Sequence, residues 1–138
     1  MPLLTSAVTV VVVLFYFFIA TRVPVARRKY NVQLPAITGH PDFERVFRVH
    51  QNTLEWMPIF LPSLWLCALL YNDLIAAVLG LVWIVARWFY YAGYARAVGG
   101  RIPGFLIQSI ACAALLILAI VGIAVRFPGL LAQWRLTP

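Results

Sequence analysis

Charge is scarce in this 138-residue chain: charged residues make up 11% of it, and only four residues are acidic. An ordinary soluble domain has about a quarter of its residues charged. Hydrophobic residues make up 64% instead. This composition excludes an ordinary soluble domain and indicates an integral membrane protein, whose chemistry has to lie on its helices or their short connections.

Residue types that react or bind metals are also few. Cys67 and Cys112 lie in apolar stretches, and no cysteine or histidine stands at the spacing of metal ligands. The sequence has neither a Ser–His–Asp arrangement for nucleophilic catalysis nor a glycine-rich phosphate loop. It therefore predicts no metal cofactor, and two buried thiols without a redox role.

Long apolar runs are abundant, and four of them approach the roughly 20 residues that span a hydrocarbon core. They predict an all-α membrane protein, a four-transmembrane-helix bundle within a single integral membrane domain, 1–138. No basic residue precedes the first run, so we interpret it as a retained helix and not as a cleaved signal. Asp42 is the expected cap of the second helix. The helices are predicted at about residues 3–29, 42–71, 74–97 and 103–126.

The basic residues cluster by connection. The second connection, Tyr71–Asp73, has none, whereas the first and third are basic, and the positive-inside rule therefore predicts that these two lie in the cytoplasm. Arg126 and Arg135 weaken this contrast. The net charge of +7 does not indicate nucleic acid as a partner, because the basic residues cluster at these connections and are not spread along a soluble face. The basic residues are Arg22, Arg27, Arg28, Lys29, Arg45 and Arg48 at the first connection and Arg96 and Arg101 at the third.

Two polar stripes at helical spacing interrupt the apolar pattern. Counted from the Tyr71–Asp73 turn at about 1.5 Å per residue, Glu55 and Tyr90 both lie roughly 25 Å away, so the stripes share one depth near the cytoplasmic boundary. An ionised residue in a spanning segment costs about 2.5–3.5 kcal/mol and usually faces a partner or a wet cavity. We therefore expect the stripes to meet. They consist of Arg48, Asn52 and Glu55, and of Arg87, Tyr90 and Tyr94.

A purely structural interpretation of the stripes stays open at this point. Arg87 and Glu55 could form an ion pair between two helices, the tyrosines could belong to an aromatic belt, and the basic cluster could bind anionic lipid. His50 alone suits a hydrogen bond on a helix surface. The ion pair would nevertheless leave Arg48 and Asn52 at the same end without a role, which favours a site for an anionic ligand.

Four stretches of the chain carry a more specific pattern: VARRKY from Val25, PAITGHPDF from Pro35, FERVFRVHQNTLEW from Phe43 and GLVWIVARWFYYAGYAR from Gly80. Together they resemble the membrane-associated glutathione transferase family (MAPEG), which includes the microsomal glutathione transferases and cysteinyl leukotriene synthase. The resemblance covers about Val25–Arg101, and the four-helix topology extends it to the whole chain.

The resemblance implies a homotrimer with one glutathione site at each subunit interface, near the cytoplasmic face. It implies that Arg101 holds the glutathione sulfur as a thiolate and that Arg28 assists near the second substrate. Trp56 and His50 depart from leukotriene synthase, which has a tyrosine and a glutamine at these positions. The residues implied in glutathione binding are Arg27, Arg48, His50, Asn52, Glu55, Arg87, Tyr90 and Tyr94.

The activity that the resemblance implies is that of a membrane glutathione S-transferase, with glutathione as co-substrate, acting on hydrophobic electrophiles; reduction of lipid hydroperoxides stays open. The alternatives are a small four-helix multidrug transporter and a lipid-binding family member without catalysis. Such transporters need a membrane-embedded carboxylate, whereas the first predicted helix has no acidic residue. The excess of arginine over lysine favours a bacterial inner membrane over the endoplasmic reticulum.

Overall fold

Four long helices form the computed structural model: α1 (Leu3–Lys29), α2 (Pro41–Leu70), α3 (Asp73–Arg96) and α4 (Ile102–Trp134), with a short 3-10 helix, η1 (Val98–Arg101), before the last. The structure describes the backbone of residues 1–96 and 98–134 and the side chains of residues 1–94 and 99–129. The predicted end of the third helix at residue 97, and the side chains of Arg96 and Arg135, lie outside the described residues.

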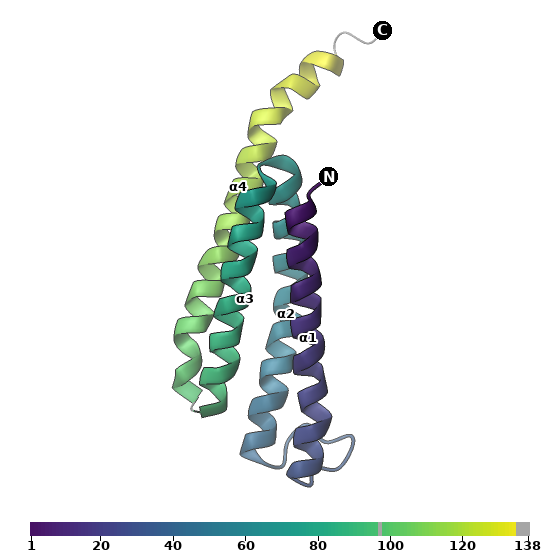
Figure 1. Ribbon diagram of the computed structural model, residues 1–138, viewed down its shortest axis with the longest axis vertical. Helices are drawn as coiled ribbons and strands as arrows, with labels where there is room; N and C mark the ends of the chain where they lie inside the picture. Colours follow the sequence, from purple (N-terminus) through teal and green to yellow (C-terminus); the bar gives the residue numbers. More distant parts are fainter. Residues whose placement is uncertain (97, 135–138) are drawn as a thin grey trace.

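The helices run up and down in chain order (Figure 1). The α1–α2 and α3–α4 connections lie at one end of the bundle, which we call the loop end. The N-terminus and the α2–α3 turn at Tyr71 and Asn72 lie at the other, the turn end. All four helices are long and apolar enough to cross a membrane. The predicted all-α four-helix membrane bundle is therefore confirmed for the described residues.

The cap of α2 and the end of α4 differ from the sequence-based expectation. The cap of α2 is His40 and not Asp42, because α2 begins at Pro41 and His40 Nδ1 accepts the Asp42 N–H at 3.2 Å. Proline suits the first helical position, where its missing N–H has no helical partner to lose.

The fourth helix, α4, is longer than expected. It continues to Trp134, past the predicted end at residue 126, with Pro128 inside it. A proline removes one helical hydrogen bond, and an otherwise apolar run still keeps the rest.

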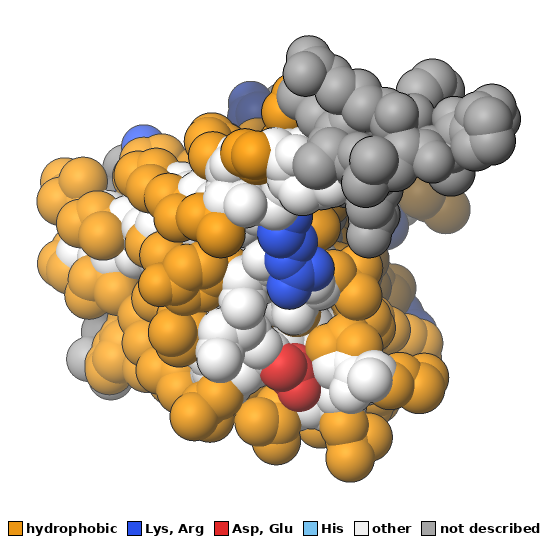
Figure 2. All heavy atoms as spheres, turned by 90° about the horizontal axis from the view of Figure 1, so that it is seen from above, with side chains coloured by type: hydrophobic (Ala, Val, Ile, Leu, Met, Phe, Trp, Pro, Cys, Tyr) orange, Lys and Arg blue, Asp and Glu red, His pale blue; other side chains and the backbone are white. Residues whose placement is uncertain are grey.

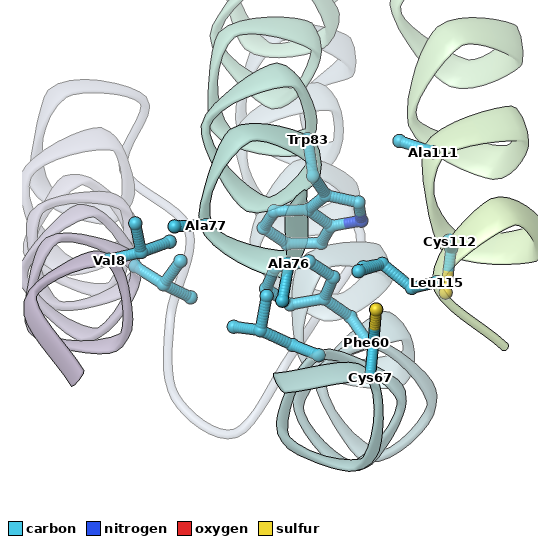
Figure 3. Packing of buried hydrophobic residues seen from close by; sticks show 11 residues of the cluster. Val8, Phe60, Cys67, Ala76, Ala77, Trp83, Ala111, Cys112 and Leu115 are labelled. Atoms are coloured by element: carbon cyan, nitrogen blue, oxygen red, sulfur yellow. The ribbon is translucent and has the colours of Figure 1, made fainter. Parts of the chain in front are cut away.

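Side chains from all four helices meet in one hydrophobic core (Figure 3). Phe60 of α2 and Trp83 of α3 stack with their ring centroids 4.0 Å apart. Cys67 and Cys112 are buried in this core as free thiols, in agreement with their predicted burial. The core thus holds α2, α3 and α4 in a fixed rotation about their axes, which decides the side chains that face one another at the loop end.

Large hydrophobic side chains also cover the outside of every helix, among them Phe17, Ile59, Val85 and Ile117. Apolar exposure on this scale marks a surface that meets another apolar phase. At the turn end, a few acidic and basic side chains lie among hydrophobic ones (Figure 2). The outer surface therefore suits the lipid of a membrane.

Asp73 at the turn end ties the first helix to the third. Its carboxylate accepts the backbone N–H of Leu4 at 3.1 Å and that of Thr5 at 3.0 Å. These N–H groups belong to the first turn of α1 and have no acceptor within that helix. Arg126 makes a second link at this end by donating to the carbonyl of Leu69 at 2.9 Å. Both contacts are far from the loop end and serve the bundle itself.

Candidate functional site

A contact between glycines closes the α3–α4 connection and positions Arg101. Gly93 and Gly100 approach so closely that a Cβ on either would overlap the other's backbone, and Gly104 lies equally close to the backbone of α3. Glycine alone permits such an approach. The short helix η1 ends at Arg101, whose guanidinium carbon lies 5.0 Å from the ring centroid of Tyr94. The tight connection therefore directs this arginine back toward α3.

Two adjoining hollows lie at the loop end, between α2, α3 and the start of α4. They share Asn52, Tyr90 and Arg101, so we treat them as one site cavity with Arg101 at the junction. The first, the polar hollow, has a volume of about 260 Å³ and is lined by Arg48, Gln51, Asn52, Glu55, Tyr90, Tyr94 and Arg101. The second, the mixed hollow, has a volume of about 310 Å³ and is lined by Asn52, Tyr90, Arg101, Ile102 and Phe105.

The structure thus brings together six of the residues that the sequence singled out. The first predicted stripe supplies one side of the cavity, and the tyrosines of the second stripe supply the other. The six residues are Arg48, Asn52, Glu55, Tyr90, Tyr94 and Arg101. Their roles toward a ligand stay predictions.

Tyr90 and Tyr94 form the aromatic wall of the cavity. Their rings stack with centroids 5.9 Å apart and planes 9° from parallel, and both side chains are buried. The guanidinium carbon of Arg87 lies 4.5 Å from the Tyr90 ring centroid, and that of Arg101 lies over Tyr94. An aromatic belt faces the membrane interface, so it does not describe these two buried tyrosines.

Arg87 lies behind the cavity, 1% exposed and not among the lining residues. Its Nη1 donates to Asn52 Oδ1 at 3.1 Å and to Gln108 Oε1 at 2.6 Å, and its Nη2 donates to Thr53 Oγ1 at 2.7 Å. A guanidinium group has donors only, so a buried arginine needs such oxygen acceptors around it. Arg87 therefore joins α2, α3 and α4 beneath the cavity, and its direct contact with a ligand stays a prediction.

Glu55 lines the polar hollow, where its carboxylate accepts a hydrogen bond from Gln51 Nε2 at 3.1 Å. The ion pair between Arg87 and Glu55, which the sequence left open, is not present among the described side chains. The ion pair found there joins Arg45 to Asp42 on the first turn of α2. The Glu55 carboxylate can therefore receive a cationic group of a ligand in the cavity.

Three further predicted residues lie outside this cavity. Arg27 donates from Nη1 to backbone carbonyls of the α1–α2 connection, the shortest bond reaching Ala36 O at 2.7 Å. Arg28 is exposed near the end of α1. His50 Nε2 lies 2.9 Å from the hydroxyl of Tyr16, and the two rings stack. One copy of the chain therefore does not bring these three residues to Arg101.

Sequence reasoning missed several residues that belong to the site or support it. A signal for Gln108 was present, because a carboxamide within the fourth apolar run needs a hydrogen-bond partner in a membrane. Ile102 and Phe105 carried no comparable signal. The missed residues are Gln51, Thr53, Ile102, Phe105 and Gln108.

Four membrane-crossing helices with a basic, aromatic cavity at one end define an integral membrane protein suited to a small anionic ligand. Among the described side chains, those of residues 1–94 and 99–129, no group of three metal-ligating residues occurs. Comparison with known proteins narrows the class. The chain belongs to the MAPEG family, whose model matches residues 5–121, a range that includes every residue lining the site cavity. The predicted family is thus confirmed.

Similar proteins come from animals and from a microbe. Microsomal glutathione S-transferase 2 of Homo sapiens is 42% identical over 125 residues, which cover 91% of this chain and 85% of the relative. Leukotriene C4 synthase of Mus musculus is 37% identical over 129 residues, covering 93% and 86%. An uncharacterized protein of Synechocystis sp. is 42% identical over 118 residues, covering 86% of each chain.

Proposed function

We propose that this protein is a glutathione transferase of the membrane, which joins the sulfur of glutathione to hydrophobic electrophiles. The observation that carries the proposal is the site cavity, in which Arg48, Glu55 and Arg101 surround one space at the end of the bundle. The names of two relatives, microsomal glutathione S-transferase 2 and leukotriene C4 synthase, support the transferase class.

The charges around the cavity complement those of glutathione, which has two carboxylates, one ammonium group and a thiol. Arginine pairs well with carboxylates through two parallel hydrogen bonds, so Arg48 is suited to one of them. Glu55 is suited to the ammonium group. Asn52 adds a neutral polar group between them. A neutral apolar ligand would leave these charges without partners.

Arg101 stands where the polar hollow meets the mixed hollow, and we assign the sulfur to this point. A free thiol with a pKa of about 8.5 is only about 3% thiolate at pH 7. Lowering that pKa by two units requires about 2.7 kcal/mol of preferential stabilisation of the anion. A guanidinium group at hydrogen-bond distance in a partly dry site can supply this stabilisation. Ile102 and Phe105 then offer an apolar surface to the electrophile.

The residues outside the cavity favour assembly with further copies of the chain, and from the family resemblance we infer that the assembly is a homotrimer. His50 and Asn52 are two positions apart on α2, which is about 200° around a helix, so they face opposite sides. His50 accordingly contacts α1, whereas Asn52 lines the cavity. A second copy that docks its α1–α2 side against the cavity would bring Arg27, Arg28 and His50 to the glutathione of the first.

The location of the cavity suits a substrate dissolved in the bilayer. The loop end has the basic connections, which the positive-inside rule assigns to the cytoplasm, and we place the protein in a bacterial inner membrane with the site on that face. Glutathione then enters from water and the electrophile from lipid. A lipid hydroperoxide is a second substrate class that the same thiolate can attack, at the peroxide oxygen.

The direct test is conjugation by the purified full chain in lipid vesicles, with glutathione and 1-chloro-2,4-dinitrobenzene. The thiolate forms a carbon–sulfur bond to the ring, chloride leaves, and the thiol proton passes to water, so absorbance of the conjugate and free chloride rise together. A parallel reaction with a lipid hydroperoxide measures the second substrate class. Binding of glutathione without turnover of any electrophile would support the non-catalytic lipid-binding alternative, and absence of binding would overturn the proposal.

A further inference from the structure

Asn52 differs from the other residues lining the cavity in how it is held in place. A series of hydrogen bonds between buried side chains reaches it from behind the cavity. Asn52 lines both hollows, Arg87 holds its Oδ1 from behind, and Gln108 of α4 holds Arg87. Gln108 is fully buried and touches no lining residue through a hydrogen bond of its own. Of the described residues, it has the shortest hydrogen bond to Arg87, at 2.6 Å between Nη1 and Oε1.

We propose that Gln108 is a positioning residue for the glutathione site, which acts through Arg87 on the carboxamide of Asn52. The inference rests on the proposed function and adds to it a residue that touches neither glutathione nor the electrophile. Gln108 affects the direction in which the side-chain amide of Asn52 faces the cavity.

The chemistry of the three groups fixes that direction. A guanidinium group only donates hydrogen bonds, so Arg87 takes the oxygen of each carboxamide and never the nitrogen. The Oδ1 of Asn52 is thereby turned to the rear, and its amide Nδ2 hydrogens are left for the cavity. Asn52 therefore meets a ligand as a donor, which suits a carboxylate or carbonyl oxygen of glutathione and rejects an amine.

The position of Gln108 follows from the close crossing of α3 and α4. Gly104 packs against the backbone at Ala86 and Tyr90, with no room for a side chain between the helices. Gln108 is four residues later and lies on the same face of α4. The short distance between the helices at Gly104 lets its carboxamide reach Arg87, one residue along α3 from Ala86.

Without Gln108, the guanidinium group of Arg87 would keep two of its three oxygen acceptors. A buried cation that lacks an acceptor shifts toward those that remain, because its desolvation is otherwise uncompensated. The nearest are Asn52 and Thr53 on α2. The Asn52 carboxamide would then change its orientation, and glutathione would lose a donor while the reacting groups around Arg101 stay in place.

The test begins with Gln108→Met, which keeps the length of the side chain and removes the acceptor. In the full chain in vesicles, we expect the KM for glutathione to rise about 10-fold and kcat to change less than about 2-fold, which is the signature of a binding interaction lost equally from the ground state and the transition state. Gln108→Glu retains an acceptor for Arg87 and should restore the KM. Ser109→Ala, next along α4, removes a hydrogen bond to Phe105 O within the helix and is the matched control.

A double-mutant cycle with Asn52→Ala separates positioning from general destabilisation. If Gln108 acts through Asn52, Gln108→Met has no further effect on the KM once Asn52 is alanine. A merely structural role would instead add its full effect to that of Asn52→Ala. If the methionine variant does not fold, Gln108→Ser replaces it in the cycle with Asn52→Ala. The same result is then expected: no further effect on the KM once Asn52 is alanine.

The outcomes separate this inference from the proposed function. Normal glutathione binding by the unchanged protein, with a KM unaltered by Gln108→Met or an additive cycle, overturns the role of Gln108 alone. Failure of the unchanged protein to bind glutathione in calorimetry overturns the proposed function and the inference with it. A raised KM that vanishes in the Asn52→Ala background, and that Gln108→Glu reverses, supports both.

Discussion

The guanidinium carbon of Arg101 lies 5.0 Å from the ring centroid of Tyr94, at the point where the polar hollow meets the mixed hollow. An aromatic ring attracts a cation without neutralising its charge, unlike a carboxylate. The charge of Arg101 therefore stays available for an anion in the cavity. The assignment of the glutathione sulfur to Arg101 depends on this relationship, and the first prediction tests that assignment.

Replacing Arg101 by alanine should lower kcat at pH 7 about 20-fold, since an unassisted thiol is only a few per cent ionised at that pH. The dissociation constant for glutathione should rise much less than kcat falls, because the carboxylates and the ammonium group keep their partners. The deficit should shrink as the pH rises through about 8.5, where the free thiol ionises by itself. Arg126→Ala, which changes an arginine at the turn end, is the control and should leave kcat unchanged. Equal losses of binding and turnover in Arg101→Ala would contradict this role.

Replacing Glu55 by glutamine should weaken glutathione binding by about 10-fold, because a neutral amide attracts the ammonium group of glutathione less than a carboxylate does. Calorimetric titration measures this change directly. An analogue of glutathione without its amino group should bind the wild-type and Glu55→Gln proteins alike. Glu44→Gln, on the first turn of α2, is the charge-matched control. A preserved preference for the ammonium group in Glu55→Gln would show that another residue receives it.

Gly99 and Gly100 are adjacent, yet alanine should affect them very differently. A Cβ on Gly100 would overlap the backbone of Gly93, whereas a Cβ on Gly99 would meet nothing within 4 Å. Gly100→Ala should therefore displace η1 with Arg101, lower kcat, and reduce stability by about 1–3 kcal/mol, the usual cost of overpacking. Thermal unfolding in detergent and the conjugation assay together measure both effects. The packing argument would be wrong if Gly100→Ala left stability and kcat unchanged, or if Gly99→Ala reduced them as much as Gly100→Ala does.

Asp73→Ala should destabilise the bundle without touching the site. The carboxylate caps the first turn of α1 through Leu4 and Thr5, and loss of a helix cap typically costs about 0.5–2 kcal/mol. We expect a lower melting temperature, with kcat and the KM for glutathione unchanged below the transition. Asp73→Asn, which keeps an acceptor oxygen, should lose less stability than Asp73→Ala.

Mixed assemblies test whether two copies of the chain build one site. Arg28→Ala and Arg101→Ala should each have low activity alone. If one subunit supplies Arg28 and its neighbour supplies Arg101, co-expression of the two variants creates some interfaces with both arginines intact, and part of the activity returns. Co-expression of Arg101→Ala with Glu55→Gln is the control, since both residues line the same cavity within one chain. No recovery in the first mixture would speak against the shared site.

Much of the architecture was predictable from the sequence, because helix formation in a membrane depends on local apolar length and on the charge of the connections. The same regularity of a helix gave the common depth of the two stripes, and five residues of these stripes line the cavity. The cap at His40 and the continuation of α4 through Pro128 were missed, because each depends on a few backbone bonds that hydropathy does not report.

Tertiary structure alone decided which polar groups face one another. The stripes that contain Glu55 and Arg87 share a depth in the sequence, yet Arg87 bonds to Asn52, Thr53 and Gln108, and His50 faces Tyr16 on the far side of α2. Spacing along the chain determines how far along its helix a residue lies and on which side of that helix. It leaves undetermined how neighbouring helices are rotated about their axes. That rotation is set by close backbone contacts at glycines and by the stacking of large side chains in the core, both of which arise only when the helices pack.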